Sequence, residues 1–528
     1  MKKLSENLML LFIVIFTGFL YFGYLGVLGL WNPDEPRYVE VAREMVSLKN
    51  FIIPHLNGFV YHHKPPMFFW AIAFFFQIFG ETKEWIARLA PALSGFFTVI
   101  ITYFYASKIF DKKIGALSAL ILLTSLNMFH LSRRCNIDTM FTLFILIAVI
   151  LLHFGILHKE KMTKYFLLSC FFQGLGIITK GPLAFIFPFL TLIGYIFFTN
   201  NKEIFKKAPW FRGLIIILAV TAAWLLPAAL AGGKEYFYAI VFKQTVSRYA
   251  HGMNHPRNFF YYFYTFPLDF LPWSLFFPLI FFRGILNKKF KPDTRLTWFF
   301  CWFIINFIFM CFSTEKRGLY LLPLSPAVAI FSAYYLLKFK FTNDKFFKIP
   351  FFILITALIL SAVLLPVFFY QKTGEINVVL TVLSAICFWI GIFSLKFYKN
   401  LGYDLKLFLI AVMWGIGIFN VHSFLFPLAN TYKSPKAFIQ RMNGIETNWD
   451  NILFFNYYNG GFNFYLNRNK INNTRNINEL KKYIGEKIRV IIVKKQSVKD
   501  IKKYLKNYKF LKKDKIGHRK FYIFLLKN

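Results

Sequence analysis

Long apolar runs separated by short polar loops recur from residue 7 to residue 426. Because about 20 apolar residues cross the hydrocarbon core of a bilayer, runs of this length predict transmembrane helices. Thirteen spans are expected, at residues 7–30, 88–107, 114–130, 138–157, 165–179, 182–200, 213–231, 265–282, 296–312, 319–337, 349–370, 377–395 and 407–426. The pattern therefore predicts a mainly α-helical, polytopic membrane protein.

The polar loops alternate in charge along this predicted path. Six of them carry at least three Lys or Arg each: "SKIFDKK", "HKEKMTK", "NKEIFKKAPWFR", "RGILNKKFKPDTR", "KFKFTNDKFFK" and "KFYKNLGYDLK". Basic loops stay in the cytoplasm, so the N-terminus with Lys2 and Lys3 is expected inside as well. The first apolar run is too long for a signal peptide and no small-residue cleavage site precedes "WNPDE", which predicts an uncleaved span.

Two regions depart from the pattern of spans. The run at 64–80 is short for a crossing, and counting it would place the Lys-rich loops outside. We interpret it as a surface or re-entrant helix in the first external loop, residues 31–87, with a second surface helix at 36–49.

Residues 430–528 lack long apolar runs. The β-rich pieces "NILFFN", "IRVIIVK" and "KFYIFLL" alternate there with the helix patterns "INELKKYIG" and "SVKDIKKYLKN". This alternation predicts a small α/β domain after a membrane domain at 1–429. An odd number of spans places this domain on the extracytoplasmic side.

Composition supports the membrane class. The chain is 57% hydrophobic and 21% aromatic with only 16% charged residues, more apolar surface than a water-soluble core needs. The formal net charge of +39 is explained by cytoplasmic anchoring loops and by attraction to anionic headgroups or phosphates, so no nucleic acid partner is expected. Five cysteines without paired spacing are interpreted as structural thiols.

Unusual polar residues gather on the predicted external side. They are Asp34, Glu35, Arg37, Tyr38, Glu40, Arg43, His55, Tyr61, His62, His63 and Lys64 in the first loop, Arg133, Arg134 and Lys180, then Arg248, His251, His255 and Arg257 before the eighth span, and Lys316, Arg317 and Tyr320 before the tenth. Basic residues outside oppose the charge bias of membrane proteins, so they call for a functional explanation or a headgroup contact.

This set suits a reaction in which a phosphate leaves and a hydroxyl attacks. Asp34, with Glu35 beside it, is the candidate general base, while Lys and Arg hold phosphate oxygens and stabilise the developing charge. The structural alternative is that Asp34 and Glu35 begin a helix as N-cap and first-turn acid. In the same way, Arg37 and Arg43 have the spacing to pair with Glu40 and Glu44 along a solvated helix face.

The histidines leave two interpretations open. His55, His62, His63, His251 and His255 fall in two external loops, which is compatible with a divalent metal site. Each one is also an ordinary residue for hydrogen bonding or headgroup contact.

Several motifs appear in a specific order: "DEPRY", "YHHKPPMFFW", "SRRCNIDTMFTLF", "GLGIITKGPLAFIFP", "HPRNFFYYFY…LPWS" and "STEKRGLYLLPLSP". Over about residues 20–335, this set resembles the bacterial GT-C membrane glycosyltransferases related to the aminoarabinose transferase of lipid A. More distantly, it is similar to the protein O-mannosyltransferases.

The resemblance implies inverting transfer of a sugar (aminoarabinose, an amino-hexose or a hexose) from undecaprenyl phosphate, outside the bacterial cytoplasmic membrane. By motif, Asp34 matches the essential loop acid. Lys64 matches the lysine that holds the lipid phosphate, Arg37 and Tyr38 lie beside Asp34, and Arg257 and Tyr320 match other phosphate-side residues. Tyr61, Lys316, Arg317 and Arg134, from the external polar set, are further candidates for donor binding. His63 stands where the family has a glutamate linked to a metal, which suggests a site for Zn, Mg or Mn at His63 and His255.

The acceptor decides what Asp34 must do. A lipid A phosphate is already anionic and needs no base, whereas a hydroxyl of a sugar or of a protein Ser or Thr does. Lipid A or another envelope glycolipid is the first expectation, and protein O-glycosylation is the alternative. A transporter or flippase for a lipid-linked substrate is the rival class, but internal repeats and polar groups inside the spans, which typify transporters, are missing from the sequence pattern.

Overall fold

The computed structural model describes residues 2–242, 256–286, 293–340, 344–484 and 488–527. The chain divides into two compact units, each built from segments far apart in the sequence. Unit 1 comprises Met1–Gly23, His62–Phe68 and Arg88–Phe424. Unit 2 comprises Tyr24–Tyr61, Phe69–Ala87 and Leu425–Asn528.

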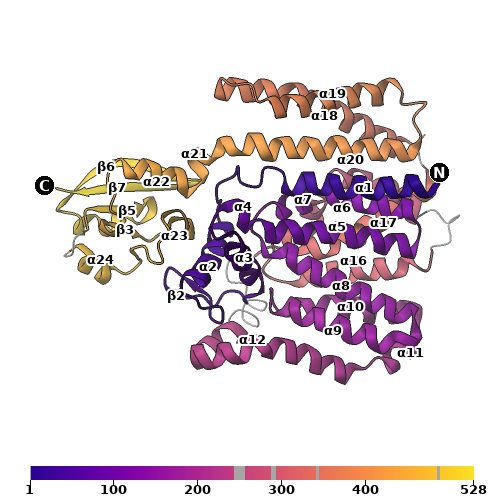
Figure 1. The fold of residues 1–528 in the computed structure, drawn as a ribbon, viewed down its shortest axis with the longest axis horizontal. Helices are drawn as coiled ribbons and strands as arrows, with labels where there is room; N and C mark the ends of the chain where they lie inside the picture. Colours follow the sequence, from indigo (N-terminus) through magenta and orange to yellow (C-terminus); the bar gives the residue numbers. More distant parts are fainter. Residues whose placement is uncertain (1, 243–255, 287–292, 341–343, 485–487, 528) are drawn as a thin grey trace. The chain divides into compact units, whose positions relative to one another are not determined.

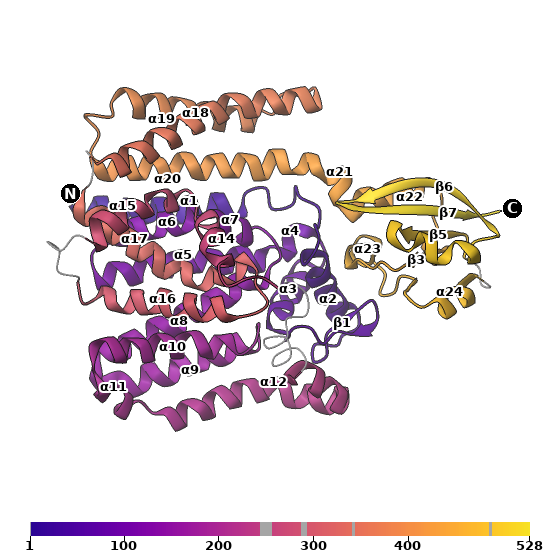
Figure 2. The same ribbon diagram turned by 180° about the vertical axis from the view of Figure 1, so that it is seen from behind.

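Unit 1 is a bundle of apolar helices, drawn from indigo to orange in Figures 1 and 2. Its helices are α1 (Lys2–Phe22), α5 (Leu89–Ile109), α6 (Lys112–Thr124), α7 (Leu126–Ser132), α8 (Ile137–Leu157), α9 (Met162–Ile177), α10 (Leu183–Thr199), α11 (Lys202–Lys207), α12 (Trp210–Tyr238), α14 (Tyr261–Asp269), α15 (Phe277–Leu279), α16 (Leu296–Phe312), α17 (Ser325–Phe339), α18 (Lys345–Thr373), α19 (Val378–Lys396) and α20 (Tyr403–Asn420). A short 3-10 helix, η5 (Gly318–Leu324), leads into α17. Helices therefore occupy all the positions at which spans are predicted.

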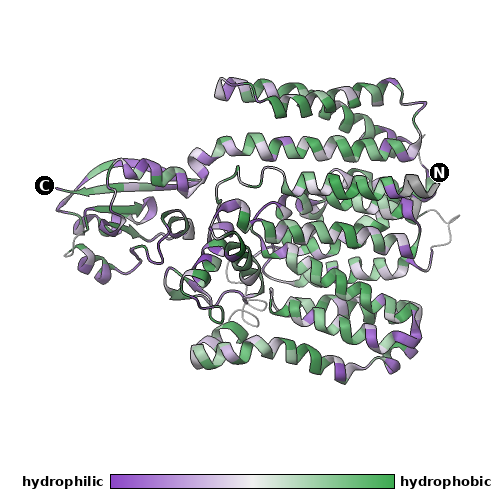
Figure 3. Ribbon diagram, in the orientation of Figure 1, coloured by the Kyte–Doolittle hydropathy of each residue, from purple (hydrophilic) through white to green (hydrophobic). Residues whose placement is uncertain are grey.

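The length and composition of these helices support the membrane assignment. Among the described residues, seven helices are long and apolar enough to cross a bilayer, or up to nine if each of two bent pairs is one span. The hydropathy colouring in Figure 3 shows apolar residues along most of the bundle. The fold class is confirmed, while the count of thirteen spans stays a prediction.

The two bent pairs lie where the sequence predicts uninterrupted spans. Helices α6 and α7 bend by 65° at Ser125, and α14 is bent by 110° from the segment Trp273–Arg283. Pro272 interrupts the second pair because proline has no N–H to donate to the preceding turn. The two breaks contact each other, since Leu126 N donates to Leu271 O at 3.0 Å.

Unit 2 contains a five-stranded mixed sheet in the order β4-β3-β5-β7-β6. Its strands are β3 (Ile452–Phe455), β4 (Asn473–Thr474), β5 (Val490–Lys494), β6 (Tyr508–Ile516) and β7 (Arg519–Leu526). Strand β3 is parallel to β4 and β5, whereas β7 is antiparallel to β5 and β6. The predicted α/β character of this segment is confirmed, although the long strand β6 was not predicted.

Alternating side chains give this sheet two apolar faces. Ile452, Phe454 and Ile492 pack on one face with α22 (Pro435–Asn443) and α23 (Gly460–Leu466). Leu453, Phe455 and Ile491 pack on the other face with α24 (Ile477–Ile484) and α25 (Val498–Ile501). Successive side chains of β3 point to opposite faces of the sheet. Because both faces are covered, every residue of the strand is buried, as in parallel sheets covered on both sides.

Unit 2 also includes most of the first predicted external loop. This part contains α2 (Glu35–Ser47), the short strands β1 (His55–Leu56) and β2 (Phe59–Val60), α4 (Glu84–Ala87) and, from Phe69 onward, α3 (Met67–Phe79). The helices predicted at 36–49 and 64–80 are therefore present, and α2 packs against α23. Their position in the membrane, and a domain boundary at 429/430, stay predictions.

Candidate active site

The predicted catalytic acid lies at the beginning of α2. Asp34 occupies the N-cap position, but its side chain makes no capping hydrogen bond to the helix. Instead, Asp34 Oδ1 accepts a hydrogen bond from Arg37 Nη2 at 2.7 Å. The Asp34 side chain is 11% exposed and that of Arg37 is 35% exposed, so this ion pair reaches the surface of its unit. The Asp34 carboxylate thus binds the Arg37 guanidinium and does not cap α2.

Glu35, the second predicted acid, has a different environment. Its side chain is buried, and Oε2 accepts a hydrogen bond from the backbone N of Trp31 at 3.2 Å. This contact fixes the turn that precedes α2. Pro36 follows in the first helical turn, where the absence of an N–H carries no cost.

Two tyrosines from separate segments complete the surroundings of Arg37. Tyr38 and Tyr61 are both buried and pack on the ring of Phe69, with centroid distances of 5.8 and 5.9 Å. The Arg37 guanidinium lies 5.7 Å from the Tyr38 ring centroid. Burial acts to lower the pKa of Arg37, but Tyr61, Tyr38 and Asp34 raise it above its usual value, so Arg37 is a permanent cation here.

Arg43 is not part of this exposed group. Its guanidinium pairs with Glu40 through two bonds, Nε to Oε2 at 2.8 Å and Nη2 to Oε1 at 2.7 Å, and both side chains are fully buried. Arg43 therefore pairs along the helix as the structural alternative has it, but on a buried face and not on a solvated one.

A second group of predicted residues lies in unit 1, where the chain before α14 meets the turn after α16. Pro256 pairs with Glu315 as an isolated antiparallel bridge, and Arg257 N donates to Thr314 O at 3.2 Å. This pairing brings Arg257 beside Lys316, whose Nζ donates to Arg257 O at 3.2 Å and also to Ser313 O. The Lys316 ammonium is buried and bonded to carbonyls, so it braces the turn.

Arg317 and Tyr320 belong to the same turn. Arg317 is the N-cap residue of η5, and its carbonyl accepts from Tyr320 N at 3.0 Å. Both side chains are half-buried. The Arg257 guanidinium lies 5.7 Å from the centroid of the Tyr261 ring.

The sequence pattern did not single out a buried ion pair next to Tyr320. Lys180 Nζ pairs with Asp138 Oδ1, and both side chains are more than nine-tenths buried. The same ammonium lies 4.4 Å from the Tyr320 ring centroid. The sequence signal that could have indicated this pair is Asp138, an acid at the beginning of an apolar span. Asn136 caps this helix, since its Oδ1 accepts from Asp138 N.

Lys64 belongs to the short segment His62–Phe68 of unit 1. In this segment, Met67 N donates to Ile178 O at 3.2 Å, which joins the segment to the turn that contains Lys180. Lys64 and Lys180 therefore lie on two segments that are bonded to each other.

The predicted metal ligands are only partly described. The rings of His63 and His62 stack at 4.8 Å, and His255, with Arg248 and His251, lies outside the described residues. Within the described parts of the chain, no group of three or more His, Cys, Asp or Glu that could hold a metal ion is found.

Of the two adjacent arginines before α8, one is structural. Arg133 is buried, and its guanidinium donates to the carbonyls of Leu20 and Gly23 at the end of α1 and to Ser423 Oγ. Arg134, the predicted donor-binding residue, is half-buried, with Nη1 at 3.5 Å from His130 Nε2.

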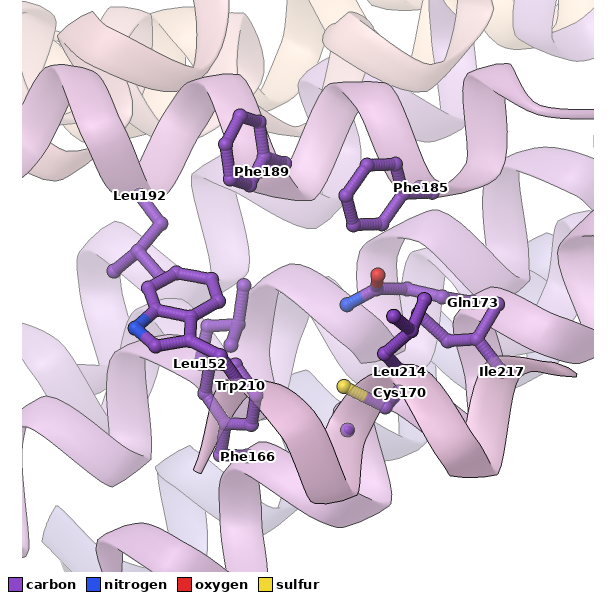
Figure 4. Close-up of a pocket in the computed structure, with 11 residues that line it drawn as sticks. Leu152, Phe166, Cys170, Gln173, Phe185, Phe189, Leu192, Trp210, Leu214 and Ile217 are labelled. Carbon is purple, nitrogen blue, oxygen red and sulfur yellow. The ribbon is translucent and has the colours of Figure 1, made fainter. Parts of the chain in front are cut away.

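Among the apolar grooves between the described helices of unit 1, two differ in size and lining. The larger one, about 520 Å³, lies between α14, α16 and α17 and is lined almost entirely by aromatic and aliphatic side chains, among them Tyr262, Phe263, Phe303, Phe307 and Phe331. A smaller one of about 200 Å³ between α8, α9, α10 and α12 is drawn in Figure 4, where Gln173 is its one amide among Phe, Leu and Trp side chains. Tyr262 of α14 lines the larger groove, and α14 packs against η5, which Arg317 precedes.

Comparisons with known proteins agree with this architecture. The family described as "Dolichyl-phosphate-mannose-protein mannosyltransferase" matches residues 63–226. A protein of Aquifex aeolicus (strain VF5), named "Uncharacterized protein", is 30% identical over 353 residues, which are 66% of this chain and 68% of that protein. An undecaprenyl phosphate-alpha-4-amino-4-deoxy-L-arabinose arabinosyl transferase of Aeromonas hydrophila is 26% identical over 346 residues, and the match spans 63% of this chain and 61% of that relative.

A solved structure extends the likeness of fold to almost the whole chain. The crystal structure of ArnT from Cupriavidus metallidurans bound to undecaprenyl phosphate superposes with a TM-score of 0.76 at 17% identity, covering 97% of both chains. The helical bundle, the mixed C-terminal sheet and these relatives agree with one another. The chain belongs to the GT-C membrane glycosyltransferases, in the group that contains the aminoarabinose transferases and the protein mannosyltransferases.

Proposed function

We propose that this protein transfers a sugar from undecaprenyl phosphate to lipid A or another envelope glycolipid, on the outer side of the bacterial inner membrane. The donor class is the one named for the Aeromonas relative, and its lipid carrier, undecaprenyl phosphate, is bound in the Cupriavidus structure. Aminoarabinose, an amino-hexose and a hexose are all compatible with the proposal.

The observation that carries the proposal is a pair of arginines near an apolar groove. Arg257 precedes α14 and Arg317 precedes η5, and the two segments are bonded to each other. Helix α14 packs against η5, and it lines the 520 Å³ groove together with many phenylalanine side chains. An isoprenoid chain needs an apolar channel and its phosphate needs guanidinium or ammonium groups, so this pairing of features fits a polyprenyl phosphate.

Asp34 is proposed to handle the proton of the acceptor. The acceptor oxygen forms a bond to the anomeric carbon, while the bond between that carbon and the phosphate oxygen breaks and its electron pair leaves with undecaprenyl phosphate. When the acceptor is a hydroxyl, its proton goes to the Asp34 carboxylate. When it is a phosphate, no proton is removed, and Asp34 with Arg37 orients the acceptor.

The cations are proposed to stabilise the departing phosphate. Lys64, Arg37 and Arg257 supply charge-assisted hydrogen bonds that strengthen as the phosphate gains charge, with Tyr38, Tyr61, Arg134, Arg317 and Tyr320 as additional donors. Lys316 is proposed to act indirectly, because its ammonium is bonded to the carbonyls of Ser313 and Arg257.

A divalent metal at His63 and His255 stays a prediction. Among the described residues, no group of three possible metal ligands includes His63. No step of the proposed reaction therefore depends on a metal. Removal of metal with a chelator is expected to leave transfer unchanged if the phosphate is held by cations alone.

Protein O-glycosylation is the second candidate, favoured by the mannosyltransferase family that matches residues 63–226. A labelled undecaprenyl-phosphate sugar, incubated with membranes that contain the protein and with either lipid A or a Ser/Thr peptide, separates the two acceptors.

The main test uses wild-type, Asp34→Asn and Lys64→Ala proteins at matched expression. We expect transfer by the wild type and a loss of about 10²-fold or more in each variant. Mass spectrometry of envelope lipids from cells with and without the protein identifies the product. Full transfer by both variants would refute the proposed roles.

A further inference from the structure

The segment that leads into α2 is held by side chains from the C-terminal part of unit 2. Gly29 N and the Trp31 indole Nε1 both donate to Asn430 Oδ1, at 3.1 and 2.9 Å. Asn430 Nδ2 in turn donates to Val27 O at 2.9 Å. One asparagine, about 400 residues away in sequence, thus bridges three points of the segment just before Asp34.

Neighbouring residues reinforce this contact. Leu30 N donates to the Tyr465 hydroxyl at 2.8 Å, and Lys433 Nζ lies 4.4 Å from the Trp31 ring centroid. Gly29 has no side chain at a point of close approach, since a Cβ there would lie 2.4 Å from Ser434 Oγ. A larger residue at position 29 would therefore displace the Ser434 side chain.

The far end of α2 is held in the same way. The Arg43 guanidinium donates to Asn467 Oδ1 at 3.1 Å and, through Nη2, to Arg468 O and Asn469 Oδ1, each at 2.9 Å. Together with its two bonds to Glu40, this buried guanidinium joins α2 to the loop after α23.

A third set of bonds passes through the turn between β1 and β2. The Glu44 carboxylate accepts from Asn57 N at 2.6 Å and from Gly58 N at 3.1 Å. Asn57 Oδ1 accepts from Ile471 N at 2.7 Å, and its amide donates to Ile471 O at 3.1 Å. The segment that leads into α2 and the far end of α2 are therefore both bonded to residues between 430 and 471.

We infer that residues 430–471 form a positioning element for Asp34 and Arg37, with Asn430 as its principal residue at the entrance to α2. None of these residues is required to touch the substrate. Buried, fully bonded polar networks specify a single arrangement, and a displacement of about 1 Å in a catalytic group is enough to cost about 10²-fold in rate. The inference concerning rate depends on the proposed function, but the inference concerning position does not.

The test uses the full chain in lipid nanodiscs with two readouts. Asn430→Ala removes the acceptor of the Gly29 amide, so hydrogen exchange at residues 27–31 is expected to accelerate by about tenfold or more. The kcat for sugar transfer is expected to fall by about tenfold or more, with the KM for the undecaprenyl-phosphate sugar changed by less than about twofold, because no donor contact is lost.

Two variants sharpen the result. Asn430→Asp keeps an acceptor for Gly29 and Trp31 and loses only the bond to Val27, so its kcat is expected to recover to within about threefold of the wild type. Arg489→Gln is the matched control, because Arg489 pairs with Glu446 on the same domain and leaves α2 untouched. This control is expected to change neither exchange at 27–31 nor kcat.

The outcomes are separable. Unchanged exchange at 27–31 in Asn430→Ala overturns the inference whatever the activity. Faster exchange with an unchanged kcat also overturns it, since the contact would then be structural alone. If Asn430→Ala does not fold, Asn469→Ala, which removes one partner of Arg43 at the other end of α2, takes its place with exchange read at 40–48. If the wild type transfers no sugar, the proposed function fails, and the exchange readout still decides whether residues 430–471 position α2.

Discussion

Helix α2 carries two ion pairs that look the same in sequence and differ in structure. Asp34 with Arg37 and Glu40 with Arg43 both have i,i+3 spacing, and both have an N–O distance of 2.7 Å. The Arg37 side chain is 35% exposed, whereas the Arg43 side chain is 3% exposed and that of Glu40 is wholly buried. The pair of Asp34 and Arg37 is therefore partly exposed, and the pair of Glu40 and Arg43 is buried.

The difference lies in what else the arginine meets. Arg43 has three further partners in the loop 467–469, so its donors are used within the protein. Arg37 has Asp34 and two tyrosines near it and retains exposed guanidinium surface. Identical spacing therefore produces a closed pair at Arg43, which the loop 467–469 covers, and a partly exposed pair at Arg37.

The largest effect is expected for Asp34→Asn. The amide keeps the size of the side chain and loses its charge and basicity, so kcat for a hydroxyl acceptor is expected to fall by about 10²–10⁴-fold. A labelled-donor assay in membranes measures this. Thermal unfolding of the purified protein is the control and is expected to change little, because the Asp34 side chain does not cap α2.

A large effect on stability is expected for Arg43→Ala. Removal of one partner leaves the buried Glu40 carboxylate without its cation, which destabilises by about 3–5 kcal/mol. Denaturant or thermal unfolding in nanodiscs measures the change. Loss of transfer without any loss of stability would contradict the structural role that separates this pair from Asp34 and Arg37.

A smaller effect is expected for Arg37→Lys. Lysine keeps the positive charge but lacks the planar guanidinium that bonds Asp34 and a phosphate at once, so kcat/KM is expected to fall by about tenfold. Steady-state kinetics with varied donor concentration measures it. Wild-type kinetics in this variant would mean that charge alone is used at this position.

The smallest effect is expected for Arg468→Gln. Its side chain pairs with Asp450, which is 68% exposed, and only the backbone carbonyl of Arg468 contacts Arg43. Exposed ion pairs contribute about 0–1 kcal/mol, so neither stability nor transfer is expected to change measurably. This variant is the matched control for Arg43→Ala, because both alter an arginine at the same junction.

The fold followed from the sequence to a large extent. Apolar runs mark the helices because a bilayer demands length and hydropathy that few other structures need, and α16 coincides with the predicted run 296–312. The strands β3, β5 and β7 were visible as short β-branched and aromatic runs. The bend between α14 and Trp273 was not, since hydropathy continues through the break.

The candidate site was predicted in part. Asp34, Arg37 and Tyr38 are close in sequence, and their association on one helix turn follows from α-helical spacing. The ion pair of Asp138 and Lys180 joins the beginning of α8 to the turn between α9 and α10, and nothing in either local pattern indicates its partner. The role of Lys316 was also hidden, because only the turn geometry directs its ammonium to backbone carbonyls.

Sequence alone determined that this chain is a helical membrane protein with acids and bases concentrated in a few loops, because periodicity and hydropathy are local properties. Tertiary structure decided which of those residues are covered. Two pairs with one spacing differ because the segment 467–469, distant in sequence, packs on Arg43 and leaves Arg37 partly exposed. Burial depends on contacts between remote segments, and such contacts leave no mark on the local pattern of residues.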